Sequence, residues 1–177
     1  MKIFAASFLT FFYNDIITHI PVHALRLFFL KIFNKKISRS AKILMHTKFL
    51  GLWNIEIGDR VVINQYCLLD GRRYKVIIRH DTDIGPYTRI WTSGHDPDSD
   101  DHELYGGDVI IDNHVWIASG VTILPKVTIE QGAVVGAASV VHKNVEKLHI
   151  VAGNPVRFIR KRINSLNYKL TYTPYFE

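Results

Sequence analysis

The chain has 177 residues, enough for one domain with a sizeable core, and 47% of them are hydrophobic, as in globular proteins. The formal net charge of +6 favours an anionic partner, such as a nucleotide, an acidic lipid surface or nucleic acid, without choosing among them. A single cysteine, Cys67, excludes an internal disulfide and suits a reducing compartment, and no Cys/His spacing resembles a zinc site.

Residues 1–54 are predicted to form a helical segment and a lead-in. Its phenylalanines recur at helical spacing, and Pro21 suits the first turn of a second helix. The expected apolar sides consist of Phe4, Phe8, Phe11 and Phe12 in the first helix and Leu25, Phe28, Phe29 and Ile32 in the second. The uncharged stretch is too short to span a bilayer, and no signal-peptide cleavage site follows it.

Two interpretations of residues 1–35 remain open. The helices either pack against the body of the protein or a sister subunit, or they insert shallowly at a membrane interface. In the second case the basic residues that would meet the lipid are Arg26, Lys31, Lys35 and Lys36.

A six-residue period dominates residues 55–146. Aliphatic residues recur at every sixth position, with a compact residue four positions after each. The aliphatic series is Ile57, Ile63, Leu69, then Ile78, Ile84, Ile90, then Ile111, Ile117, Ile123, Ile129, Val135 and Val141. The compact series includes Cys67, Val115, Val121, Val127, Ala133, Ser139 and Val145. Strand alternation in a sandwich would be interrupted by Gly/Pro turns every two or three blocks, whereas the steps from Ile111 to Val141 run on across Gly120, Pro125, Gly132 and Gly136.

Such a period predicts a mainly β fold in which each block is one short strand and one corner. Three blocks close a coil, and stacked coils bury a continuous core. Two interruptions are expected to project from one face: extra residues at 72–75, and a loop inserted at 93–107. Residues 147–177 then form a basic C-terminal segment and tail.

The pattern resembles the hexapeptide-repeat acyltransferases, in particular the galactoside, maltose and polysaccharide O-acetyltransferases. The matching motifs are Thr92-Ser93-Gly94-His95-Asp96-Pro97, Val115-Trp116-Ile117-Ala118-Ser119 and Val151-Ala152-Gly153-Asn154-Pro155. The resemblance implies a left-handed parallel β-helix, a homotrimer with active sites between subunits, and acetyl-CoA as co-substrate. No resident metal is expected.

Acetyl transfer to an alcohol needs a base for the hydroxyl proton and donors for the oxyanion that develops. Histidine titrates near neutrality, and His95 opens the long inserted loop directly after a coil. The resemblance assigns His95 as general base and Ser119 as the residue that meets the oxyanion. His102 and His114 are rivals, and His114 is expected at an exposed corner.

The resemblance also implies the binding residues. Those for the cofactor are Trp116, Ala137, His142, Lys143, Ala152, Arg157 and Arg160, and those for the sugar acceptor are Asn64 and Asp70. His142 departs from the family, which usually has Thr there. From the residues alone, Trp116 is equally well read as a packed face or subunit contact, and the C-terminal basic cluster, which includes Arg162, as a solvated surface. Cys67 is interpreted as core packing rather than as a nucleophile.

The sequence therefore predicts a cytoplasmic O-acetyltransferase of polysaccharide or surface-glycan biosynthesis, with the inner face of the membrane as an alternative place within the cytoplasm. Two alternatives remain: an acetyltransferase for a xenobiotic or amino acid, and a metal-binding β-helix of the γ-carbonic-anhydrase kind. For the second, the set His80, His95, His102 and His114 lacks the usual spacing, and the acidic loop after His95 fails the EF-hand pattern. Nucleic-acid binding has only charge in its favour.

Overall fold

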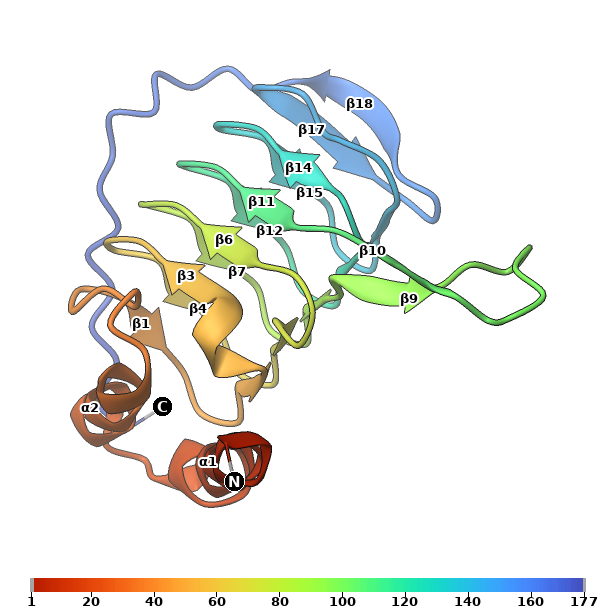
Figure 1. Ribbon diagram of the computed structural model, residues 1–177. Coiled ribbons are helices and arrows are strands. Elements are labelled where there is room, and N and C mark those ends of the chain that lie inside the picture. The colour runs from red at the N-terminus through yellow and green to blue at the C-terminus, as the bar shows by residue number, and fades with distance from the viewer. Residues whose placement is uncertain (1, 177) are drawn as a thin grey trace.

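Short parallel strands wind around three faces of a prism in the computed structural model, which describes residues 2–176 and, in the first helix, side chains from Ser7 onward (Figure 1). The first face consists of β1 (Lys42–Ile43), β4 (Val62–Ile63), β7 (Asp83–Ile84), β12 (Trp116–Ile117), β15 (Val134–Val135), β17 (His149–Ala152) and β18 (Arg157–Lys161). The second consists of β2 (Lys48–Leu50), β5 (Leu68–Asp70), β8 (Arg89–Ile90), β13 (Thr122–Ile123) and β16 (Val140–Val141). The third consists of β3 (Ile55–Ile57), β6 (Val76–Ile78), β11 (Val109–Ile111) and β14 (Thr128–Ile129).

The chain visits the faces in this order, so each coil has a first corner after the first face, a second corner after the second face and a third corner after the third. Every strand pair between successive coils is parallel, with aliphatic residues in register, as in Ile84 with Ile117 and Ile90 with Ile123. The predicted parallel β-helix is confirmed.

The core consists of the two residue series that the period predicts. None of the aliphatic or compact residues named above is more than 2% exposed. Burying an aliphatic side chain stabilises a fold by about 1.5–3 kcal/mol. The two buried residue series are therefore the main source of stability of the β-helix.

The winding begins before residue 55, where the period was expected to start. Ile37, Ile43 and Phe49 are already buried, and the strands or bridges that hold them pair with the next coil. The short helix η2 (Leu52–Asn54), preceded by Gly51 in the left-handed region, adds residues to the second corner of this first coil. The six-residue step is broken there, which hides the first coil from a search that follows the strict period.

The second corner also carries the two expected insertions. Residues 71–75 widen it between β5 and β6. The longer insertion is an antiparallel ribbon of β9 (Ser93–His95) and β10 (Leu104–Gly106), which projects from the prism (Figure 1). Insertions on successive coils therefore lie above one another at one corner.

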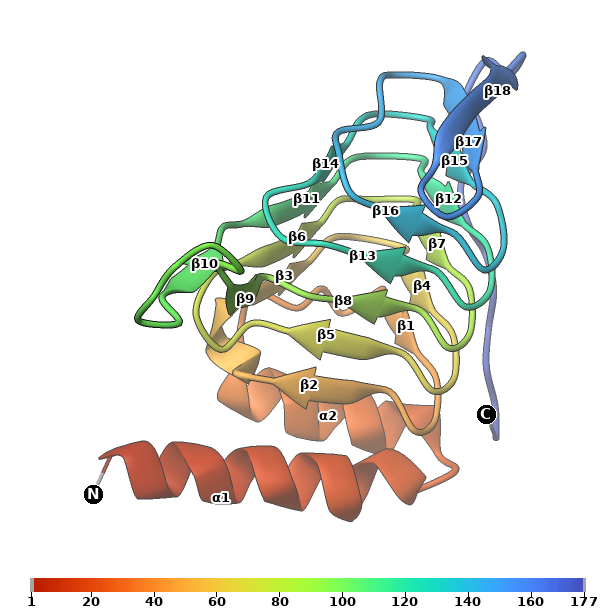
Figure 2. The same cartoon turned by 90° about the vertical axis from the view of Figure 1, so that its right-hand side faces the viewer.

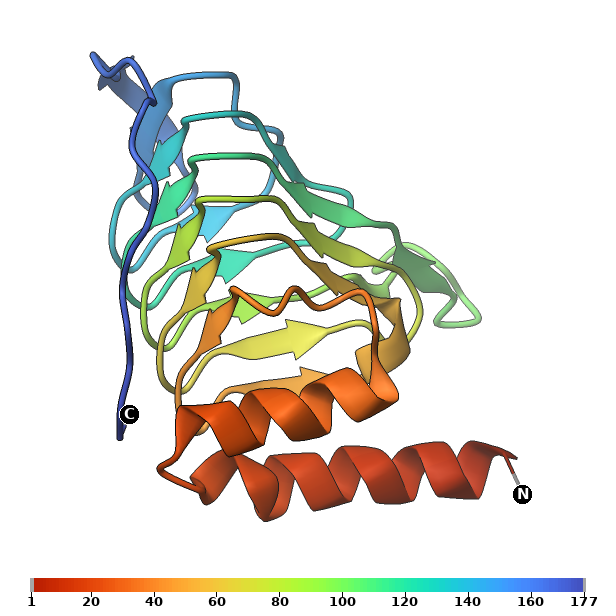
Figure 3. The same ribbon diagram turned by 90° about the vertical axis from the view of Figure 1, so that its left-hand side faces the viewer.

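Two helices, α1 (Lys2–Asp15) and α2 (His23–Phe33), joined by η1 (Ile17–His19), lie across the open end of the first coil (Figures 2 and 3). The strands there have no neighbour on one side, and their backbone groups need partners. The Asn14 side chain satisfies both backbone groups of Phe49: it donates to the carbonyl (2.8 Å) and accepts from the N–H (2.9 Å). His23 Nε2 accepts the N–H of Ile43 (3.1 Å), and Arg26 donates to the Ile43 carbonyl (3.2 Å).

Because Asn14, His23 and Arg26 face the strand edge, several large apolar side chains of the same helices face solvent. Phe8, Phe11, Leu25, Phe28 and Ile32 are each between 46% and 60% exposed. These five side chains do not pack against the body of the protein, whereas Tyr13, Ile17 and Leu30 of the same segment are buried in the core, as the first interpretation expected. Phe12 and Phe29 are half-buried and in ring contact with each other, and Phe4 lies outside the described side chains.

Arg26 was expected among the basic residues that would meet lipid, and this expectation is wrong. Its side chain is fully buried, because the carbonyls of Ile20 and Ile43 need its guanidinium as a donor. Burial lowers the pKa of Arg26 from its ordinary value.

The C-terminal tail runs back along the third corner (Figure 3). Arg162 donates to the carbonyls of His114 (2.9 Å) and Gly132 (3.1 Å), and the Tyr168 ring lies 4.9 Å from that of His114. His114 is consequently 8% exposed, so the expectation of an exposed corner is wrong: the tail covers it.

Candidate functional site

His95 lies where the ribbon leaves the prism, in a hollow of about 510 Å³ at the second corner. The hollow is lined by His95 with Arg72, Arg73, Trp91, Ser93, Gly94 and Leu104. Its residues come from the two successive insertions and the end of the second face. The stacking of insertions at one corner is what creates the hollow.

The orientation of the His95 ring is fixed by the other strand of the ribbon. His95 Nδ1 lies 2.8 Å from the carbonyl oxygen of His102, and the two rings stack with centroids 3.7 Å apart. A carbonyl can only accept, so Nδ1 carries the hydrogen, and in the neutral ring Nε2 is the nitrogen with the lone pair. The sequence analysis treated His102 as a rival, whereas the geometry makes it the group that orients His95.

Asp70 lies beside this hollow. Its buried carboxylate forms an ion pair with Arg72, with contacts of 2.9 and 3.1 Å, and its carbonyl accepts the Thr92 hydroxyl at 2.7 Å. The Arg72 side chain is 56% exposed and lines the hollow. Asp70 is thus placed to hold Arg72, which the sequence analysis did not single out.

Asn64 lies at the first corner, apart from Asp70. Its side chain donates to Asp83 (3.1 Å) and to the carbonyl of Ile84 (2.9 Å) in the next coil. The two residues expected at the acceptor site are therefore not brought together within one chain.

A second hollow, of about 480 Å³, lies on the first face. Among the residues that line it are Trp116, Ala137 and Arg160, and its walls include Val134, Ile150 and Ile163. Trp116 is 47% exposed, so it is not packed within this chain. The exposed Ser119 follows β12 nearby, and Ala152 ends β17 on the same face.

The remaining expected cofactor residues are exposed and lie around the last coils. His142 and Lys143 follow β16 at the second corner, and Arg157 begins β18. Arg162, counted with the basic cluster, lines the first-face hollow and also donates to backbone carbonyls at the third corner.

Cys67 is 1% exposed, and its Sγ lies 3.2 Å from the carbonyl oxygen of Gly85. Burial raises the pKa of the thiol to about 12. The thiol stays protonated at neutral pH, which supports its interpretation as core packing rather than as a nucleophile.

The four histidines considered for a metal site divide between two corners. His80 and His114 meet at the third corner, where they and Asp81 offer ligand atoms within 4.8 Å of one another. Asp81 already accepts two hydrogen bonds from Arg60, at 2.7 and 2.8 Å, which hold the pKa of its carboxyl far below the ordinary value. A metal ion there would face the positive charge of Arg60.

No family model matches the sequence. A Saccharomyces cerevisiae protein named as an acetyltransferase is 39% identical over 113 residues, which are 61% of this chain and 56% of that protein. A chloramphenicol acetyltransferase of Agrobacterium fabrum is 32% identical over 62% of this chain and 55% of its own length. Escherichia coli WcaF, named as a colanic acid biosynthesis acetyltransferase, is 29% identical over 79% of this chain and 76% of its own length. The chain thus spans little more than half the length of the first two.

Solved structures give a fuller match. A maltose O-acetyltransferase from Clostridium difficile matches with a TM-score of 0.78 and 26% identity, over 90% of this chain and 86% of that one. A hexapeptide-repeat acetyltransferase from Vibrio cholerae, complexed with acetyl-CoA, matches with a TM-score of 0.78 and 27% identity, over 90% of this chain and 86% of that one. A galactoside acetyltransferase in complex with coenzyme A matches with a TM-score of 0.77 and 26% identity, over 98% of this chain and 86% of that one. The fold is that of the hexapeptide-repeat acetyltransferases.

The resemblance drawn from the sequence motifs is therefore confirmed, with the left-handed β-helix that it implies. In this hexapeptide-repeat fold, the His95 hollow lies at the second corner of the prism, whereas the other hollow lies on the first face. Strand β8 of the second face runs toward His95, whereas Ser119 and Trp116 precede the second face. One chain thus presents two separate parts of the expected site.

Proposed function

We propose that the protein transfers an acetyl group from acetyl-CoA to a sugar hydroxyl, with Nε2 of His95 as the general base. The observation that carries the proposal is the bond from His95 Nδ1 to the His102 carbonyl, which leaves Nε2 as a proton acceptor beside an open hollow. The relatives and structural neighbours named above, which are acetyltransferases, support the reaction class.

In this reaction the hydroxyl oxygen attacks the thioester carbonyl carbon while Nε2 of His95 takes the hydroxyl proton. The tetrahedral intermediate then breaks its carbon–sulfur bond, and His95 returns the proton to the departing sulfur, giving an ester and free CoA. Ser119 is proposed to meet the oxyanion through its N–H or hydroxyl. No acetylated enzyme is formed.

The donor is proposed to lie along the first face. Trp116 and Ala137 would line the pantetheine arm, with Ala152 at the end of the neighbouring β17, because the first-face hollow has apolar walls and a cationic part at Arg160 and Arg162. Lys143, Arg157 and Arg160 would meet its phosphates. His142 stands where the family usually has Thr, so the contact it makes with the donor is specific to this chain.

The two parts of the site would then be joined between copies of the chain. His95 of one subunit would face Ser119 and Trp116 of its neighbour, as expected for a homotrimer. Acceptor binding is proposed for Asp70, acting through Arg72, and for Asn64 contributed across the interface.

A sugar acceptor in polysaccharide or surface-glycan biosynthesis is supported by three relatives: the galactoside enzyme, the maltose enzyme and WcaF. The hollow beside His95 is polar and carries Arg72 and Arg73, which suits an acceptor with hydroxyl and acidic groups. Use of acetyl-CoA, together with the lone buried thiol, favours a cytoplasmic location.

The base is tested by incubating the protein with acetyl-CoA and candidate glycans and measuring free thiol, with mass spectrometry of the products. His95→Ala should lower the rate by about 10²–10⁴-fold, whereas His19→Ala, at an exposed histidine on the helical cap, should not change it. Full activity of the His95 variant would refute the role of His95.

Subunit sharing is tested by mixing two inactive variants. Co-expressed His95→Ala and Ala137→Arg chains should regain part of the activity, because a mixed interface joins one intact His95 to one intact donor groove. Failure of mixed trimers to regain activity would place the whole site within one chain.

A second candidate acceptor is a xenobiotic, favoured by the similarity to the chloramphenicol enzyme. The same thiol assay with chloramphenicol in place of the glycan distinguishes the two. Among the residues that the structure describes, the His80, Asp81 and His114 cluster is the one that favours a metal-dependent function. Metal analysis of the purified protein tests it directly.

A further inference from the structure

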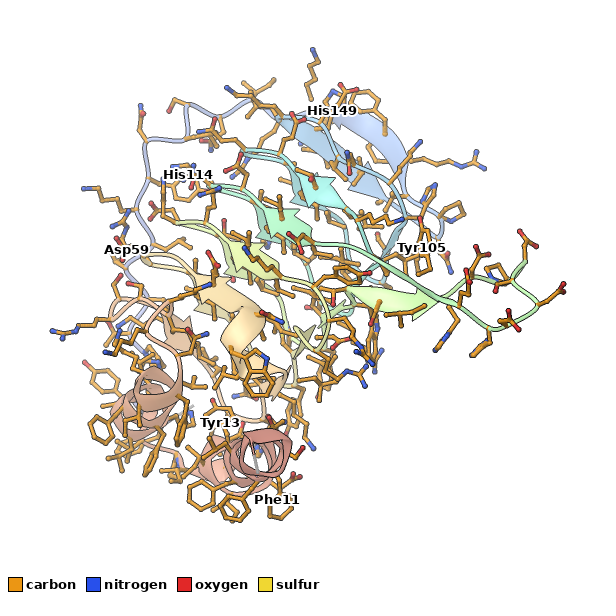
Figure 4. All side chains as sticks on the ribbon, in the orientation of Figure 1. Phe11, Tyr13, Asp59, Tyr105, His114 and His149 are labelled. Carbon is orange, nitrogen blue, oxygen red and sulfur yellow. The ribbon has the colours of Figure 1, made fainter. Side chains whose placement is uncertain are left out.

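The two helices that close the first coil have an unusual distribution of residues. Asn14, His23 and Arg26 point inward to the strand edge, beside the buried Tyr13 and Leu30. A second set of large apolar side chains points into solvent. Figure 4 shows both sides on α1, where Tyr13 points toward the prism and Phe11 points away from it. Exposed large apolar residues grouped on one surface mark an interaction site.

We define the apolar face as Phe8, Phe11, Ile16, Val22, Leu25, Phe28 and Ile32, which are 38–60% exposed. These residues come from α1, α2 and the connection between them, and they occupy the end of the prism rather than its sides. The inward side of the same helices already contributes Tyr13, Ile17 and Leu30 to the core. Folding therefore does not require large apolar residues on the outward side.

The charge around the apolar face identifies its partner. The first 55 residues contain eight Lys or Arg and a single acidic residue, Asp15, which gives them a formal charge of +7, whereas the rest of the chain sums to −1. Asp15 is itself paired with Lys48 at 3.5 Å. The whole net charge of the protein thus lies in its helical cap and first coil.

Cations directly border the apolar residues. A groove of about 480 Å³ lies between α2 and the first coil. The coil side carries Arg39 and Lys42, and the α2 side consists of His23, Ala24, Leu27, Phe28 and Lys31. Lys35 and Lys36, just past α2, are exposed. Aromatic side chains rimmed by lysine and arginine are typical of surfaces that lie in the headgroup region of anionic membranes.

The basic rim of the apolar face consists of Lys31, Lys35, Lys36, Arg39 and Lys42. We propose that the apolar face and this basic rim dock the protein on an anionic lipid bilayer, with both helices lying in the plane of the interface. No helix among the described residues is long and apolar enough to cross a bilayer, and α1 with its 14 residues is only about 21 Å long. Docking therefore places the aromatic side chains at the headgroup boundary. It is independent of the proposed acetyl transfer.

The geometry also relates the docked face to the candidate site. A hollow beside α1 is lined by Phe11, Trp53 and Arg72 together with neighbouring α1 residues, and Arg72 also lines the His95 hollow. The two hollows therefore adjoin at one side chain. A glycan carried on a membrane lipid would meet His95 from the docked end.

The test is co-sedimentation of the full chain with phosphatidylcholine vesicles, with and without phosphatidylglycerol. Binding should require phosphatidylglycerol and weaken at high salt. The double variant Phe11→Ser/Phe28→Ser should reduce vesicle partitioning about tenfold or more, and so should Lys35→Glu/Arg39→Glu. All four side chains are exposed, so circular dichroism and the thermal midpoint should stay unchanged.

The matched control is Lys147→Glu/Lys169→Glu, at two exposed lysines on the opposite half of the chain, and this variant should bind vesicles as the parent does. No sedimentation of the parent protein with either vesicle would overturn the proposal. So would a change in sedimentation mass of the phenylalanine variant without loss of vesicle binding, which would assign the face to contacts between copies. Acetyl transfer to a soluble sugar should be unaffected in every variant, which separates this proposal from the proposed function.

Discussion

His23 makes the attachment of the helical cap dependent on pH. Its Nε2 accepts the N–H of Ile43, and burial, followed by the charges of Arg26 and Lys42, lowers its pKa from 6.5 to about 4. The unfolded chain therefore binds a proton between these two values that the folded chain does not. Stability supported by His23 is complete above pH 6.5 and is lost as the pH falls toward 4.

The size of this loss follows from the shift. Each pKa unit corresponds to about 1.4 kcal/mol, so full protonation would cost the fold about 3 kcal/mol, of which about 2.5 kcal/mol is lost by pH 4.5. His23 is only 7% exposed, so solvent screens the charge weakly. Other histidines contribute to the overall slope, because burial also lowers the pKa values of His46 and His114.

The variant His23→Gln isolates the contribution. A glutamine carbonyl can accept the Ile43 N–H without titrating. Urea unfolding followed by circular dichroism at about pH 7.5 and pH 4.5 should show a loss in the parent that exceeds the loss in the variant by about 2 kcal/mol. His19→Gln, at an exposed histidine, should behave as the parent. Equal losses in the parent and His23→Gln would refute the reasoning.

Two further predictions concern the first coil. Asn34→Ala removes a side chain that donates to the carbonyls of Leu52 (2.7 Å) and Ile55 (2.6 Å), and should lower the unfolding free energy by about 1–3 kcal/mol in urea; an unchanged value would contradict this role. Gly51→Ala should lower the thermal midpoint, because φ is +68° and a Cβ would lie 2.6 Å from backbone atoms of the neighbouring coil. Gly94→Ala is the control, since a Cβ there meets nothing within 4 Å, and an equal effect of both would count against the steric argument.

The repeat could be predicted from the sequence because every interior position is set by one local rule. Ile117 or Ile123 needs only its six-residue spacing to be placed in the core. The first coil escaped the rule because Gly51 and η2 interrupt the spacing. A period search that tolerates insertions at corners would have found Ile37 and Ile43.

The helical cap could not be predicted in the same way. Hydrophobic periodicity assumes that the apolar side of a helix faces the core, which fails when the neighbouring surface is an open strand edge that needs hydrogen bonds. Asn14, His23 and Arg26 answer that need, and they do so at positions that look like the solvent side of each helix. His114 shows the same limit, because the tail that buries it is 54 residues further along the chain at Tyr168.

Within the candidate site, the choice of His95 came from its place at the start of an insertion, and its catalytic role stays a prediction. Its orientation depends on the carbonyl of His102, which only the pairing of the two ribbon strands brings near. Arg72 was missed for a similar reason, since its importance comes from the buried Asp70 beside it. Contacts across an inserted ribbon have no sequence period to reveal them.

The covered ends of the β-helix limit how copies of the chain can associate. Parallel coils have no intrinsic length, and an open terminal coil is a template on which another chain could continue the stack. Here the polar side chains of α1 and α2 occupy one end, and at the other the antiparallel strand β18 pairs with β17 on the first face. Stacking of another chain is thereby blocked at the first coil, and the first face cannot be continued by a parallel strand at the last coil. The lateral surfaces of the prism carry the two hollows that the proposed reaction would join.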